Sequence, residues 1–348
     1  MLKKDLGLLV LLLVVGAVTA IINPLFLSPI NIANTANLVG LFGIFSIGQG
    51  FVIITGGIEL SVGSVIALLG VVFVDLVGNR GVPWPLTALI VLAIGWLMGL
   101  VHGLLITRVK LQPFVVTLCG LLIYRGVARY YTRDATAGFS FGQSFPDLEW
   151  ITTGRTDIVA TLTGGNVHSI LIPHSFMIML VLAVIMWVVL HRSVFGRYLF
   201  AVGKNEEAAR YSGIRTTRVI VAAYMICTTT AALSAIFFAM YTRSILPSGH
   251  GNFYELYAIA AAVLGGFSLR GGEGSIIGVV LGTILLQVLQ NLVNLLGIPS
   301  SLNFAVMGSV ILIGVVADQQ FATFRRRREL LRGRMAAGSG PAVAEPAE

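Results

Sequence analysis

The stretch LTALIVLAIGWLMGLVHGLLIT, residues 86–107, contains no Asp, Glu, Lys or Arg. As an α-helix it would be about 33 Å long, at about 1.5 Å per residue. This length matches the bilayer's hydrocarbon core, about 30 Å thick, and predicts a transmembrane helix. Similar apolar runs lie near residues 6–22, 35–55, 62–77, 114–131, 173–190, 217–241, 255–269, 275–297 and 302–317. We therefore predict an all-α polytopic membrane protein with about ten transmembrane helices.

The composition supports this class of protein. Of the 348 residues, 56% are hydrophobic and 11% are charged, whereas a soluble domain is about 25% charged. The mean hydropathy is +0.91. These values exclude a soluble globular protein, a disordered protein and a disulfide scaffold. The 40 glycines fit helices that approach closely in lipid, and Cys119 and Cys227, both in apolar runs, are interpreted as packing residues.

The charge pattern predicts the topology. A net charge of +8 would suggest nucleic acid as the partner of a soluble protein, but membrane proteins gather Lys and Arg in cytoplasmic connections. Ten spans place most of the basic residues on one side: Lys3, Lys4, Arg108, Lys110, Arg192, Arg197, Lys204, Arg210, Arg215, Arg218, Arg325 to Arg328, Arg332 and Arg334. We predict cytoplasmic termini, a transmembrane domain over 1–318 with a cytoplasmic segment at 191–218, and a basic, then disordered tail over 319–348. No nucleic acid partner is expected. A cleaved signal peptide ending near Val18-Thr19-Ala20 is the alternative for the N-terminus.

Two glycine-rich segments interrupt the apolar pattern beside short runs. GGIELSVGS spans 56–64 and GGFSLRGGEGS spans 265–275. They can be overlaid with Gly56-Gly57 on Gly265-Gly266 and Gly63-Ser64 on Gly274-Ser275. Such paired interruptions in two halves of a chain indicate an internal repeat and a transport pathway. Two ordinary cytoplasmic turns are the alternative.

Glu59 is the carboxylate nearest an apolar core. An ionisable residue in lipid is a functional candidate, because its burial costs at least about 2.5 kcal/mol. Its structural alternative is to stabilise the start of the next helix through the helix dipole, with Ser61 as the N-cap. His102 and Gln49 are interpreted as packing contacts within spans.

Two sets of polar residues recur at helical spacing. Arg125, Arg129 and Arg133 are expected to snorkel to the outer interface, or else to form a docking patch for an acidic partner. A second set shares one face of the ninth span: Gln287, Gln290, Asn291 and Asn294. This face either lines a pathway for a hydroxyl-rich solute or forms interhelical hydrogen bonds.

The segment 191–218 contains a predicted short helix. Asn205 is a suitable N-cap, Glu206 and Glu207 occupy the first turn, Glu206 and Arg210 are spaced for an ion pair, and Gly213 ends the helix. A helix of two turns is marginal alone. We therefore expect it to be stabilised by docking, on this chain or on a partner.

No catalytic motif is present. The chain lacks a P-loop for ATP, a zinc-ligand cluster and a nucleophile elbow. This disfavours an intramembrane enzyme. An ion-coupled secondary transporter is the second hypothesis, with Glu59 as its coupling acid.

Three motifs resemble a known family. GGIELSVGS (56–64), AVGKNEEAARYSGI (201–214) and GNFYELYAIAAAVLGGFSLRGGEGS (251–275), with NLVNLLGI (291–298), are similar to motifs of bacterial ABC importer permeases for monosaccharides, the branch that includes ribose, xylose, galactofuranose and autoinducer-2 systems. The resemblance runs from about residue 30 to 318. Glu59 and Tyr257 stand where the family usually has Asp.

The resemblance implies a bacterial inner-membrane subunit that moves a small sugar. Its partners would be a separate ABC ATPase carrying ATP and magnesium, a periplasmic or extracellular sugar-binding protein, and a second permease copy or paralogue. This chain would hold no cofactor. The implied ATPase-coupling helix contains Asn205, Glu206, Glu207, Ala208, Ala209, Arg210 and Gly213. The implied pathway includes Gly56, Gly57, Glu59 and Ser61, to which the polar face adds Gln290, Asn291 and Asn294.

Overall fold

The computed structural model describes residues 2–157 and 171–299, and in addition Leu302, Ala305, Gly308, Ser309 and Leu312. The chain divides into two compact units, Met1–Ser300 and Ser301–Glu348. The second unit contains only those five described residues. Most of the predicted tenth span therefore lies outside the described residues, and the predicted domain boundary at 318 and the tail lie wholly outside them.

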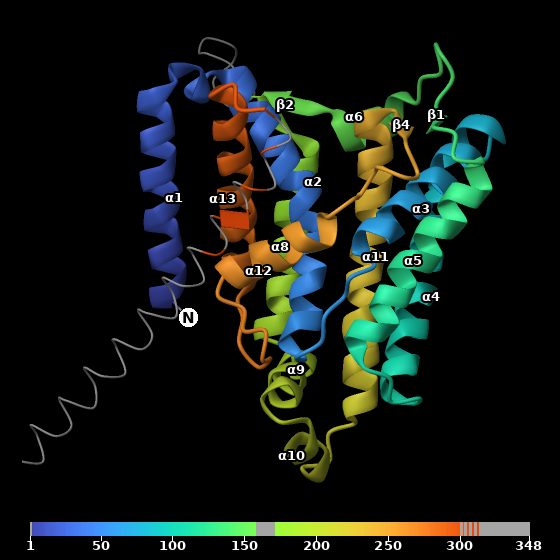
Figure 1. Cartoon of the computed structure of the whole chain (residues 1–348), viewed down its shortest axis with the longest axis vertical. Helices are drawn as coiled ribbons and strands as arrows, with labels where there is room; N and C mark the ends of the chain where they lie inside the picture. Colours follow the sequence, from blue (N-terminus) through green and yellow to red (C-terminus); the bar gives the residue numbers. More distant parts are fainter. Residues whose placement is uncertain are drawn as a thin grey trace, which may run out of the picture. The chain divides into compact units, whose positions relative to one another are not determined.

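The first unit is built almost entirely of helices (Figure 1). They are α1 (Leu2–Ile22), η1 (Pro24–Leu27), α2 (Pro29–Ile54), α3 (Val62–Val74), η2 (Asp75–Asn79), α4 (Trp84–Thr107), α5 (Pro113–Thr132), α6 (Pro146–Thr153), α8 (His174–His191), α9 (Val194–Lys204), α10 (Glu206–Tyr211), α11 (Thr216–Thr242), α12 (Tyr254–Leu264) and α13 (Ile276–Leu295). Each of the first nine predicted runs overlaps one of these helices. In the described part of the chain, six helical stretches are long and apolar enough to cross a membrane. The prediction of an all-α polytopic membrane protein is confirmed.

Four short strands form two antiparallel pairs. β1 (Ala137–Gly138) pairs with β4 (Ser244–Ile245), and β2 (Arg155–Asp157) pairs with β3 (Leu171–Pro173). They lie with α6 at the upper end of the unit in Figure 1, opposite α9 and α10. The described part of the 132–172 segment is thus folded against the ends of the helices.

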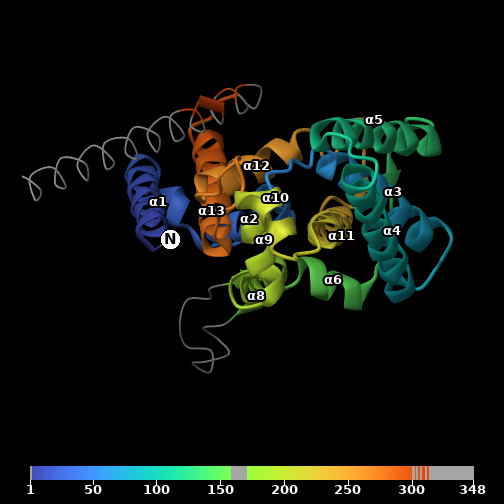
Figure 2. The ribbon, with the colours of Figure 1, turned by 90° about the horizontal axis from the view of Figure 1, so that it is seen from below.

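The core lies around α2 and α11. In the most apolar part of α2, 94% of the residues are buried, against 28% in α4 and in α8. Figure 2 shows α2 and α11 between α1 and α13 on one side and α4 and α5 on the other. The exposed apolar side chains of α4 and α8 therefore form surfaces that suit lipid.

A stripe of glycines explains the close contact of α4 with α11. Gly95, Gly99 and Gly103 recur every four residues and share one face of α4. A Cβ at Gly99 would lie 2.3 Å from the Thr228 hydroxyl oxygen, and one at Gly103 would lie 2.6 Å from the Val221 Cα. Only glycine permits this approach of two backbones, as expected for helix packing in lipid.

Both glycine-rich segments break the helical path. Gly56 has φ +80° directly after α2, and Gly266 has φ +84° directly after α12. Each donates its N–H to the carbonyl three residues earlier, and the next helix begins after Ser61 or after Ser275. The equivalent residues are therefore Gly56 with Gly266 and Ser61 with Ser275. This match of helix ends differs from the overlay drawn from sequence, which pairs Gly56 with Gly265 and Ser64 with Ser275.

The first turns of α3 and α12 meet inside the unit. A Cβ on Gly63 of α3 would lie 2.0 Å from the carbonyl oxygen of Gly251, just before α12. In Figure 1 this meeting point lies about midway between the two ends of the unit. The predicted span 255–269 is shorter than expected, because α12 ends at Leu264.

Candidate functional site

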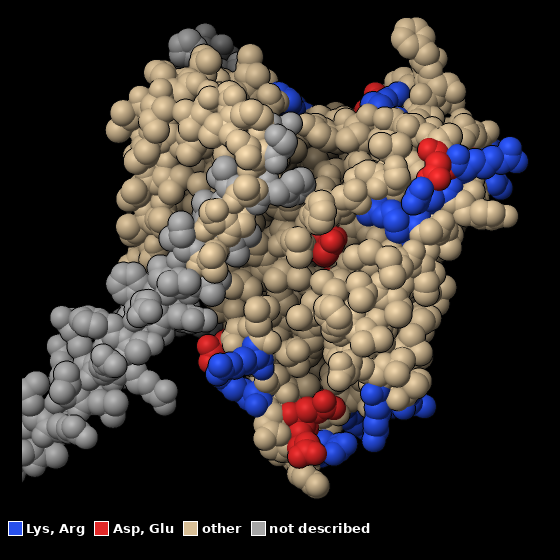
Figure 3. Space-filling model, in the orientation of Figure 1, with Lys and Arg blue, Asp and Glu red and all other residues tan. Residues whose placement is uncertain are grey.

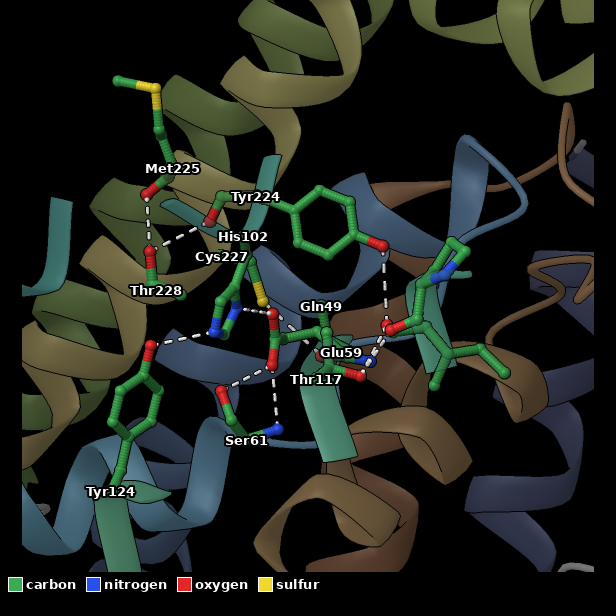
Figure 4. A network of polar contacts seen from close by, with 12 residues as sticks. Gln49, Glu59, Ser61, His102, Thr117, Tyr124, Tyr224, Met225, Cys227 and Thr228 are labelled. Carbon is green, nitrogen blue, oxygen red and sulfur yellow. Dashed lines mark hydrogen bonds and ion pairs between the residues drawn. The ribbon is translucent and has the colours of Figure 1, made fainter. Parts of the chain in front are cut away.

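A buried network surrounds Glu59 (Figure 4). The Glu59 side chain is fully buried. Its Oε1 accepts hydrogen bonds from the Ser61 N–H at 2.8 Å and the Ser61 hydroxyl at 2.6 Å, and its Oε2 lies 2.8 Å from His102 Nδ1. Both carboxylate oxygens are therefore occupied by donors from this chain.

His102 extends the network to a third segment. Its Nε2 lies 2.8 Å from the Tyr124 hydroxyl oxygen. The imidazole therefore bridges the carboxylate and the phenol, with Nδ1 facing Glu59 and Nε2 facing Tyr124. A carboxylate acceptor on one side favours a proton on Nδ1. Gly120 makes room for the ring, since a Cβ there would lie 2.8 Å from Nε2. The network joins the segment before α3 to α4 and α5.

One expectation about these residues was right only in part, and another was wrong. Ser61 is the N-cap residue of α3, but its side chain makes no cap hydrogen bond and its hydroxyl donates to Glu59. His102 is not a lone packing contact, because it pairs with a carboxylate 43 residues away in the sequence. No local pattern could have revealed this pair. The geometry favours the structural interpretation of Glu59 over an ion-coupling role.

A second intramembrane acid, Glu255, was missed from the sequence. It is 8% exposed and lies in the first turn of α12. A Cβ on Gly63 would lie 2.7 Å from its Oε2, so this carboxylate adjoins the first turns of both α12 and α3. Its position, an acid within the apolar run 255–269, was the available signal.

Arg125 fixes the chain that leads into α12. Its Nη1 donates to the carbonyl oxygens of Pro247 at 2.8 Å and His250 at 2.6 Å. The expectation that this side chain snorkels to the outer interface was wrong, because backbone carbonyls within the protein bind it.

The polar face of α13 forms an interhelical contact. Asn291 and Asn31 of α2 exchange amide hydrogen bonds of 2.8 and 3.0 Å. Gln287 is buried and Gln290 half-buried, and their side-chain carbonyl oxygens have no partner among the described residues. Asn294 is exposed. The interhelical interpretation holds for Asn291, and the two glutamines keep spare hydrogen-bonding capacity.

The predicted short helix is present as α10. The Asn205 side chain accepts from the Ala208 N–H at 2.9 Å, and Gly213 follows the helix with φ +85°. Glu206, Glu207, Ala208 and Arg210 are exposed, whereas Ala209 is buried. The predicted ion pair between Glu206 and Arg210, both described and exposed, is not formed. α10 lies at the lower tip of the unit, where charged side chains gather on the face drawn in Figure 3.

A cavity of about 580 Å³ lies at the opposite end. Arg243, which follows α11, pairs with Glu149 of α6 at 2.6 Å. The Phe145 backbone N–H and, after it, the Arg243 guanidinium hold the pKa of the Glu149 carboxyl below its ordinary value, against the effect of burial. The cavity is lined by Asn37, Gly142, Gln143, Ser144, Glu149, Thr153, Arg155, Met240, Tyr241 and Arg243.

No described residues form a metal centre: among them, no three His, Cys, Asp or Glu side chains converge as ligands would.

Residues 31–315 match the model of a family described as the branched-chain amino acid transport system / permease component. The chain belongs to this family.

Three relatives of this chain are named as sugar import permease proteins. The ribose import permease protein RbsC of Bacillus subtilis (strain 168) is 38% identical over 315 residues, which cover 90% of this chain and 91% of the relative. RbsC of Escherichia coli (strain K12) is 34% identical over 312 residues, covering 90% and 92%. The fructose import permease protein FrcC of Rhizobium meliloti is 30% identical over 323 residues, covering 90% and 84%. No solved structure is significantly similar to the permease.

Proposed function

We propose that this chain is the permease subunit of a bacterial ABC importer that takes up a monosaccharide such as ribose. The relatives named for ribose and fructose support a sugar substrate over the amino acids in the family's description. A separate ATPase supplies the energy from ATP and magnesium, a sugar-binding protein delivers the substrate from outside, and a second permease copy or paralogue completes the pathway. The protein lies in the bacterial inner membrane with ten spans and cytoplasmic termini.

The observation that carries this proposal is the surface of α10. A six-residue helix is too short to persist without support. Ala209 fixes it to the protein, while Asn205, Glu206, Glu207, Ala208, Arg210 and Gly213 stay exposed. α10 is therefore a small, charged projection on the side rich in Lys and Arg, and it is suited to dock on the ATPase.

The pathway is assigned to the two interrupted segments. Gly56, Gly57, Glu59 and Ser61 shape the first, with Glu59 holding it in place. Gln290, Asn291 and Asn294 belong to the polar face of α13, which continues from the second. Discontinuous helices are a recurring feature of transport pathways.

Co-purification tests the proposal. The native chain and its Arg210→Glu variant are expressed with the ATPase and binding protein, solubilised in detergent and captured. We expect the ATPase to co-purify with the native chain and with Arg108→Glu, which makes the same charge change at the end of α4, but not with Arg210→Glu. A native chain that arrives alone, and that moves ribose in proteoliposomes without ATP, would overturn the proposal in favour of ion-coupled transport.

A further inference from the structure

The end of α9 lies directly against both interrupted segments. A Cβ on Gly203 would lie 1.8 Å from the carbonyl oxygen of Ile54, the last residue of α2. It would also lie 2.4 Å from the backbone nitrogen of Gly272, in the turn between α12 and α13. Real Cβ contacts are not this short, so Gly203 is required for three backbones to meet.

The same point is joined by a backbone hydrogen bond. The Gly272 N–H donates to the Ile54 carbonyl oxygen at 2.8 Å. This bond satisfies one of the carbonyls that the end of α2 leaves unpaired. Gly271 also lies against it, because a Cβ there would be 2.8 Å from the Gly203 carbonyl oxygen and 2.9 Å from the Gly56 nitrogen. Gly271 and Gly272 have φ of +84° and +71°, a backbone conformation that favours glycine.

One ion pair crosses the contact. Lys204 Nζ lies 2.8 Å from Glu273 Oε1, and the two side chains are 60% and 53% exposed. A pair so exposed adds little to stability. Its geometric effect is more specific, because it ties the last residue of α9 to the turn before α13. The next residue, Asn205, is the N-cap of α10.

The contact of Gly203 with Ile54 and Gly272 is therefore continuous with three segments of the chain. One leads through Asn205 into α10. The second leads from Ile54 through Gly56 into the segment that Glu59 holds. The third leads from Glu273 through Ser275, the N-cap of α13, into the helix that carries Gln287 and Gln290. A displacement of α10 reaches both interrupted segments at this one point.

We propose that Gly203 and the Lys204–Glu273 pair are positioning residues for transport. Through them, a movement of α10 displaces the interrupted segments 56–64 and 265–275 together. This inference rests on the proposed function, since α10 moves only if it docks on the ATPase. The pair sets the coupling between ATP hydrolysis and uptake, and it contributes neither to ATPase binding nor to the affinity for sugar.

The test uses the complete importer in proteoliposomes with radiolabelled ribose. The variants are Lys204→Glu, Glu273→Lys and the exchanged pair, with Arg270→Glu as a matched charge reversal in the same turn. We expect the single variants to retain the ATPase and its hydrolysis but to take up about fivefold less ribose per ATP, the scale of one exposed ion pair. The double variant Lys204→Glu/Glu273→Lys should restore most of the ribose uptake per ATP, and Arg270→Glu should leave it unchanged.

Gly203→Ala provides a second, independent measurement. We expect it to bind the ATPase and to lose more of the uptake per ATP than either charge variant, because the added methyl separates the three backbones. A normal ratio in Gly203→Ala, or an exchanged pair no better than the single variants, would overturn the inference while native uptake upholds the proposed function. A native chain that binds no ATPase would overturn both.

Discussion

Replacing Glu59 tests whether hydrogen bonding or charge holds the first interrupted segment. In Glu59→Gln, the amide oxygen can accept from the Ser61 N–H and hydroxyl as Oε1 does now. The amide nitrogen can donate to His102 Nδ1 if the imidazole proton moves to Nε2, and the Tyr124 hydroxyl then accepts instead of donating. The bonds from Ser61 keep their direction and those along His102 and Tyr124 reverse, so the cost should be about 1 kcal/mol.

The Leu side chain in Glu59→Leu cannot replace any of these hydrogen bonds. It leaves the Ser61 N–H and the His102 Nδ1 buried without a partner, in addition to the Ser61 hydroxyl. Each buried unsatisfied group costs about 1–3 kcal/mol, which gives a loss of at least about 3 kcal/mol. Tyr124→Phe removes only the last bond of the chain and should cost about 1 kcal/mol.

The assay is the fraction of purified protein that stays monodisperse in detergent after heating to a series of temperatures. We expect the native protein to stay monodisperse to the highest temperature. Glu59→Gln and Tyr124→Phe should follow at similar, slightly lower temperatures, and Glu59→Leu at a much lower one. If Glu59→Gln loses as much thermal stability as Glu59→Leu, the negative charge and not the hydrogen-bond network holds the segment. If Glu59→Leu matches the native protein, the structural role of Glu59 is wrong.

Two further predictions concern helix packing and pH. Gly99→Leu should cost about 1–3 kcal/mol of stability or more, because the space beside Thr228 is already filled; Gly126→Leu, whose Cβ position has nothing within 4 Å, should stay near native in the same heating assay. The lowered pKa of Glu149 means that its bond from the Phe145 N–H and, after it, its pairing with Arg243 stabilise the protein above the ordinary carboxyl pKa. This stabilisation is lost as the pH falls through the lowered value. Between about pH 5 and pH 3 the native protein should lose more thermal stability than Glu149→Gln, and parallel losses would refute a stabilising role for the Glu149 charge.

Local sequence accounts for the elements of this protein. The apolar run 86–107 matches α4 closely because a bilayer demands a long run with no charge, whatever its neighbours are. α10 was predictable because Asn205 and Gly213 end it through contacts only a few residues away. The interruptions at 56–64 and 265–275 were visible for the same reason, since glycine and polar residues break an apolar helix locally.

The contacts between these elements were decided by tertiary structure alone. His102 pairs with Glu59 across 43 residues, and Asn31 pairs with Asn291 across 260. The end of α9 meets Ile54 and Gly272 only because α2, α9 and the turn before α13 converge in space. A sequence fixes which side chains and backbone groups in lipid require a partner. Which partner each one receives depends on how the helices pack, because residues far apart in the chain become neighbours only in the folded protein.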